Sequence, residues 1–67
     1  MPIKIDTFGN VMTVATGSGI EIFDARKLVR PFLREKVRGV RDFIYEPNIG
    51  KLFVGCEGKL KVYAATY

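Results

Sequence analysis

The side chains with catalytic chemistry are few and lie far apart along the chain. The seven acidic residues are Asp6, Glu21, Asp24, Glu35, Asp42, Glu46 and Glu57. A general acid and a general base must share one cleft, and no spacing among these carboxylates requires that arrangement. The chain has no histidine, so a serine or cysteine nucleophile lacks its usual base. We therefore expect no enzymatic activity and no catalytic residues.

The sequence also has few residues that could bind a cofactor or a metal. Ser18 lies between Gly17 and Gly19, but the longer Gly-x-Ser-x-Gly elbow is missing and no glycine-lysine pair follows, so a turn is the better interpretation. Cys56 is the only cysteine, which excludes an internal disulfide and, without histidine, a zinc cluster. We expect Cys56 to pack as a small hydrophobic residue. The sequence thus predicts no metal, no cofactor and no small-molecule substrate.

The chain is short for a self-sufficient domain. A fold of 67 residues buries only about 60% of the surface of its unfolded chain, and small domains usually need a covalent or metal staple. No apolar run approaches the roughly 18 residues of a membrane span, and the N-terminal residues lack the apolar region of a secretory signal. An unpaired cysteine fits a reducing compartment. We expect a cytoplasmic protein that gains stability from other subunits.

The net charge of +4 is concentrated in one segment. Its basic side chains, with Glu35 as the one acid among them, are Arg26, Lys27, Arg30, Arg34, Lys36, Arg38 and Arg41. Phe32 lies within this segment and could stack on a nucleic-acid base beside Arg30 and Arg34. One interpretation is a patch for an acidic partner or a phosphate backbone. The other is a solvated basic strand that protects a sheet edge.

A repeat of forty residues organises the chain. The segment 20–25 (IEIFDA) matches 60–65 (LKVYAA), and the same offset sets 12–15 against 52–55. Carried back without a gap, it sets Ile3 and Ile5 against Phe43 and Tyr45, apolar against apolar. A period of forty is typical of four-stranded propeller blades. The chain then comprises a first blade-like repeat, 1–40, and a partial second repeat of three strands, 41–67.

Alternation and turn chemistry predict an all-β fold, an antiparallel meander of about seven short strands. In the last strand, Lys59 and Lys61 face one way and Leu60 and Val62 the other, as in a half-buried sheet. The predicted strands are 3–6, 11–15, 20–24, 28–37, 43–45, 52–55 and 59–63.

The fourth of these strands has a competing interpretation. Segment 28–37 alternates poorly, and as a helix it would have Asp24 as N-cap and Leu28, Phe32 and Leu33 on one face. Pro31 would then lie inside the helix at a cost of about 3 kcal/mol, whereas an edge strand tolerates proline. We favour the edge strand, and the forty-residue period agrees with it.

These residues resemble the WD-repeat β-propeller family. Phe23-Asp24 sits where that family's Trp-Asp dipeptide closes the third strand, and 17–24 (GSGIEIFD) looks like its second turn and third strand. The second copy, 56–63, is similar but is followed by Ala64 in place of the acid, and the family's Gly-His dipeptide is missing. The resemblance implies blade-like sheets in a scaffold that binds partners.

A partial ring would leave apolar sheet surface open on both sides, and such patches mark interfaces. We expect an interaction module completed by copies of itself or by docking on a larger assembly. Its proposed partner edge is the last strand, with Lys59, Lys61, Tyr63 and Tyr67, because an uncovered edge offers free backbone donors and acceptors. The alternative is a small basic β-protein that binds RNA or DNA through the basic segment.

Overall fold

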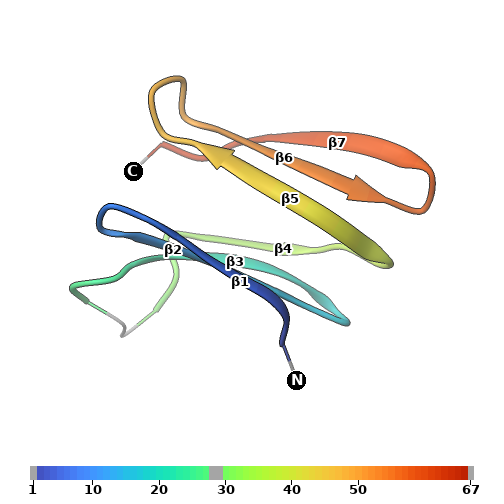
Figure 1. Cartoon of the computed structure of the whole chain (residues 1–67), viewed down its shortest axis with the longest axis horizontal. Helices are drawn as coiled ribbons and strands as arrows, with labels where there is room; N and C mark the ends of the chain where they lie inside the picture. The colour runs from blue at the N-terminus through green and yellow to red at the C-terminus, as the bar shows by residue number, and fades with distance from the viewer. Residues whose placement is uncertain (1, 28–29, 67) are drawn as a thin grey trace.

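The chain folds into two antiparallel β-sheets in the computed structural model, which describes residues 2–27 and 30–66. Figure 1 shows the sheets as two layers, the N-terminal one below the C-terminal one. The strands are β1 (Pro2–Phe8), β2 (Val11–Thr16), β3 (Gly19–Asp24), β4 (Leu33–Lys36), β5 (Val40–Glu46), β6 (Lys51–Cys56) and β7 (Lys59–Ala64). The predicted all-β meander of seven strands is therefore confirmed.

Each sheet follows the order of the chain. Sheet A has the order β1-β2-β3-β4 and sheet B the order β5-β6-β7, with every neighbouring pair antiparallel. Tight turns join consecutive strands as antiparallel neighbours. Between β6 and β7, Glu57 and Gly58 both have positive φ, 49° and 73°, as a two-residue turn matched to the strand twist requires.

A link of three residues joins the sheets, between the end of β4 and the start of β5. Val37, at its start, is buried in the core, and Gly39 has a φ of +67°. A Cβ on Gly39 would lie 2.8 Å from the Glu57 Cγ. The left-handed backbone therefore favours glycine where the chain passes from one sheet to the next.

One hydrophobic core joins the two sheets. Sheet A contributes the alternate residues of β2 and β3, and sheet B contributes those of β5 and β6, as strand alternation dictates. The buried hydrophobic residues are Val11, Ala15, Ile20, Ile22, Val37, Val40, Phe43, Tyr45, Leu52, Val54, Cys56 and Ala65. Cys56 is thus a buried free thiol, in the environment expected for a packing residue.

The segment that follows β3 contains an edge strand. The helix alternative is therefore wrong for the part of this segment that the structure describes. The Phe32 N–H donates to the Ile22 carbonyl at 2.8 Å, and Leu33–Lys36 then pairs with β3 as the last strand of sheet A. The strand is shorter than the predicted 28–37, and Pro31 precedes it, where its missing N–H breaks no ladder. Leu28 and Val29 lie outside the described residues.

The ungapped alignment of the first strands is wrong by two residues. The β1–β2 ladder sets Ile5 opposite Val14, and the β5–β6 ladder sets Phe43 opposite Val54. Ile5 therefore corresponds to Phe43, not to Tyr45. The cause is turn length, because two residues separate β1 from β2 and four separate β5 from β6.

Within residues 2–27 and 30–66, no helix is long and apolar enough to cross a membrane.

Candidate interaction surfaces

The outer face of sheet B, which points away from the core, is an exposed apolar surface. Register places Ile44, Phe53 and Val62 in one row across β5, β6 and β7. Leu60 lies in the next row and is 69% exposed, and Val62 is 51% exposed. A contiguous patch of this kind marks an interaction site more often than scattered apolar residues do.

Side-chain orientation in β7 differs from the expectation. The predicted alternation is present, with Lys59 and Lys61 on one face and Leu60 and Val62 on the other. However, the apolar pair is the solvent-facing one, whereas Lys61 lies opposite Val54 on the side of the core. The exposed apolar surface is therefore larger than a half-buried sheet would leave.

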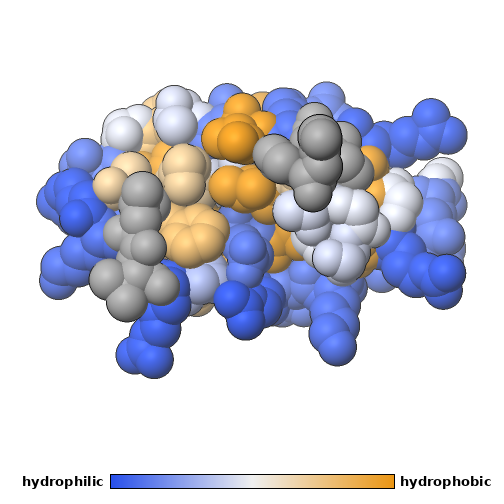
Figure 2. Space-filling view, turned by 90° about the horizontal axis from the view of Figure 1, so that it is seen from below, coloured by the Kyte–Doolittle hydropathy of each residue, from blue (hydrophilic) through white to orange (hydrophobic). Residues whose placement is uncertain are grey.

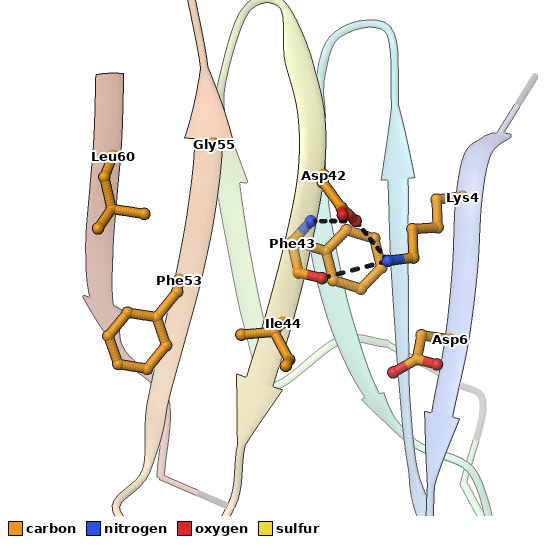
Figure 3. A pocket seen from close by; sticks show the side chains of 8 residues that line it. All are labelled: Lys4, Asp6, Asp42, Phe43, Ile44, Phe53, Gly55 and Leu60. Atoms are coloured by element: carbon orange, nitrogen blue, oxygen red, sulfur yellow. Dashed lines mark hydrogen bonds and ion pairs between the residues drawn. The ribbon is translucent and has the colours of Figure 1, made fainter. Parts of the chain in front are cut away.

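A hollow of about 420 Å³ opens on this outer face where β1 of sheet A meets β5. Figure 3 shows its lining side chains on strands of both sheets. Gly55 lies between Asp42 and Leu60 in the two ladders. Because glycine has no side chain, the space between the Asp42 and Leu60 side chains stays open. The lining residues are Lys4, Asp6, Asp42, Phe43, Ile44, Phe53, Gly55 and Leu60.

An ion pair at this hollow joins the two sheets. The Lys4 ammonium donates to the Asp42 carboxylate and, at 3.3 Å, to the Phe43 carbonyl (Figure 3). It also lies 4.7 Å from the centroid of the Phe43 ring, in cation–π range. The hydrogen bond from Lys4, followed by that from the Phe43 N–H, lowers the pKa of Asp42. Since both side chains are exposed, the pair fixes position more than it adds stability.

The outer face of sheet A is the second apolar surface. By register, Ile5 neighbours Val14 and Met12 neighbours Phe23, all on the side away from the core. Ile5 is 56% exposed, and the other three are partly exposed. The space-filling view from below, the side on which sheet A lies, shows hydrophobic side chains gathered among hydrophilic ones (Figure 2).

The proposed partner edge is a free sheet edge within the part of the chain that the structure describes. Strand β7 pairs with β6 and is the last strand of sheet B. Tyr63 packs against the core and lies opposite Leu52, while Lys59 and Lys61 are exposed. Tyr67, the fourth predicted edge residue, lies outside the described residues.

The basic segment is spread over several elements. Arg26 and Lys27 follow β3, Arg34 and Lys36 belong to β4, Arg38 lies in the link and Arg41 lies in β5. Two of these arginines are engaged by acids, because Arg26 Nε lies 3.1 Å from Asp24 Oδ1 and Arg34 Nε lies 2.6 Å from Glu21 Oε2. These pairs leave less positive charge for phosphate than the sequence alone indicated.

Part of the basic segment does come together. Lys27, Arg30 and Phe32 line a hollow of about 250 Å³ beside Asp24. The Phe32 ring packs edge-on against Tyr45, with centroids 6.4 Å apart, so the core holds one side of it. The contact with Tyr45 limits Phe32 as a stacking platform for a base, and the Asp24 carboxylate in the same hollow opposes a phosphate.

Sequence reasoning missed the residues that build the outer-face surfaces: Ile5, Ile44, Leu60, Val62 and the Lys4–Asp42 pair. Alternation indicated that Leu60 and Val62 share a face, but not which face is covered. The forty-residue match of Leu60 with Ile20 gave no sign of this exposure, because it sets Leu60 at the position of a core residue. Comparison with known proteins adds no further guide, since no family model, curated protein or solved structure matches this chain.

Proposed function

We propose that this protein is a non-enzymatic interaction and assembly module, built from blade-like sheets and completed by self-association or by docking on a larger protein assembly. The observation that carries the proposal is the outer face of sheet B, where Ile44, Leu60 and Val62 are each more than half exposed. Solvent exposure of a connected apolar face is unfavourable, and a second surface that covers it removes the cost.

The layered arrangement supports the same proposal. A four-stranded sheet followed by a three-stranded one is the division that the WD-repeat resemblance implies, and a scaffold of that type works by contact. An unpaired, buried Cys56 suits the cytoplasm as the place of action. We include in the proposal the relationship of the two sheets to propeller blades and the cytoplasmic location.

The second candidate is RNA or DNA binding through the basic segment. The hollow that brings Lys27 and Arg30 to Phe32 favours it. The ion pairs of Arg26 and Arg34 weigh against it, because each neutralises a cation that would otherwise contact phosphate. We therefore rank it second.

Light scattering across a concentration series tests the proposal. We expect the mass of the unmodified chain to rise above that of a monomer as concentration rises, and the association to persist between about 50 and 200 mM salt, because apolar contacts carry it. Ile49→Lys is a matched control, since Ile49 is a 59% exposed turn residue on neither outer face, and it should associate normally.

The contradicting result is a well-folded chain that stays monomeric at every concentration tested. A nucleic-acid mixture run beside it separates the second candidate. Binding to RNA or DNA that falls by orders of magnitude over the same salt range would favour phosphate recognition instead.

A further inference from the structure

The first three strands of the two sheets share one register. Strands β2 and β6 begin forty positions apart, as do β3 and β7. Their ladders agree as well, because Val14 pairs with Glu21 and Val54 pairs with Lys61. Position in one sheet therefore predicts position in the other, with an offset of forty for the second and third strands and of thirty-eight for the first.

The sheets nevertheless bury opposite faces of this common unit. In β2 the buried residues are the odd-numbered ones, Val11, Thr13 and Ala15. In β6 they are the even-numbered ones, such as Leu52 and Val54. Because forty is an even offset, these residues lie on opposite sides of equivalent strands. Sheet A thus packs one face of the common unit against the opposite face of the same unit in sheet B. This is a head-to-tail contact.

Each outer face repeats a face that is buried elsewhere in the same chain. Exposed Leu60 and Val62 of sheet B occupy the positions of Ile20 and Ile22, which are both fully buried. On sheet A, the partly exposed residues Met12, Val14 and Phe23 occupy the positions of Leu52, Val54 and Tyr63, and Ile5 occupies that of Phe43. Hydrophobic character is kept at these six positions, whereas Ile44 and Phe53 of sheet B occupy the positions of Asp6 and Thr13.

Charge is complementary in the same way. The sheet A position that pairs with Asp42 is Lys4, and Lys4 itself is the equivalent of Asp42 in the ladders. When the stack continues, Asp42 of sheet B would thus meet Lys4 of the sheet A that follows. The Lys4–Asp42 ion pair that joins the sheets within one chain would then form again between chains, with the cation of one chain facing the anion of the other.

We infer that the outer face of sheet B docks the outer face of sheet A of a second copy of this chain, continuing the contact between its own two sheets. The inference rests on the proposed self-association and specifies its geometry. A head-to-tail contact uses two different surfaces, so each copy has one of each and the assembly grows into a ring, or into a filament if the rotation does not close.

Two surface variants and their mixture test this geometry. Leu60→Lys places a charge on the outer face of sheet B, and Ile5→Lys places one on the outer face of sheet A. Each alone should weaken association about a hundredfold or more, because the lysine would be buried without a partner. Mixed in equal amounts, they should form a dimer that grows no further, since each supplies the intact face that the other lacks. Light scattering measures the mass, and Ile49→Lys should associate like the unmodified chain.

Other outcomes overturn the inference without ambiguity. If Ile5→Lys still associates alone, sheet B pairs with itself; if the mixture stays monomeric while the unmodified chain associates, some other surface is used. A strictly monomeric unmodified chain would instead contradict the proposed function. Thr7→Lys and Ile44→Lys lie on the same two faces at exposed positions and replace either variant if it fails to fold, as judged by circular dichroism.

Discussion

Replacement of Ile20 by alanine will lower the free energy of unfolding by about 2–5 kcal/mol, whereas the same truncation of Leu60 will change it by about 0.5 kcal/mol or less in dilute solution. The two residues hold equivalent positions in β3 and β7. Ile20 is fully buried between the sheets, so its loss leaves a cavity. Leu60 is 69% exposed, so its loss leaves none.

Urea denaturation at two protein concentrations measures both effects. The Ile20→Ala loss should appear at each concentration and remove most of the stability, which is about 3–5 kcal/mol for a core of this size. The Leu60→Ala loss should grow with concentration, because association stabilises the folded state by mass action. Equal losses for the two variants in dilute solution would show that the sheets bury the same face, contrary to the structure.

Tyr45→Phe will destabilise the chain by about 1–3 kcal/mol, because it leaves a buried carbonyl without its donor. The Tyr45 hydroxyl donates to the Ala65 carbonyl at 2.6 Å, and the Ala65 N–H donates to the Gly50 carbonyl at 2.8 Å. These two bonds fasten the segment after β7 over the β5–β6 turn. Removal of the hydroxyl should therefore also accelerate amide hydrogen exchange at Ala65.

The pH dependence of stability isolates the Tyr45 hydroxyl. Burial raises the pKa of Tyr45 above its usual value of 10. The folded state thus favours the neutral phenol, and this contribution is fully present below about pH 10 and is lost as the pH rises through the raised pKa. In urea midpoints measured between pH 8 and 11, part of the alkaline decline should be absent in Tyr45→Phe. Tyr63→Phe, at a partly buried tyrosine, is the control; an identical decline in both variants would contradict the assignment.

Strand positions were predictable because turn chemistry and alternation are local properties. Gly9-Asn10 and Glu57-Gly58 mark tight turns, and the runs between the turns alternate with period two. Even the uncertain edge strand followed from a local fact, the cost of Pro31 inside a helix. The observed strands agree with the predicted ones, apart from the shorter β4, because these turns and alternating runs are decided without long-range contacts.

The buried face of each sheet was not predictable in the same way. Leu60 and Val62 alternate with lysines as a core face would, and only packing against sheet A decides that the opposite face is covered. The predicted match of Ile5 with Tyr45 failed for a related reason. A turn two residues longer in the second hairpin shifts the first strand and leaves no trace in the apolar pattern.

The basic segment shows the limit of charge counting. A run of cations along a chain is one surface only if the fold keeps it together. Here β4 belongs to sheet A and β5 to sheet B. Arg26 and Arg34 also pair with Asp24 and Glu21, two acids that precede the basic segment. Lys27 and Arg30 line one small hollow with Phe32 and Asp24. Arg34 and Lys36 line another, together with Glu21 and Glu35.

We expect both outer faces to be contact surfaces of a single kind of assembly. A dilution series followed by two-dimensional ¹H–¹⁵N NMR of the unmodified chain tests it most directly. As concentration rises, the amide signals of Met12 and Val14 on sheet A and those of Leu60 and Val62 on sheet B should shift together, while Ile49 in the β5–β6 turn stays unchanged. Signals that move in only one sheet, or in neither, would contradict it.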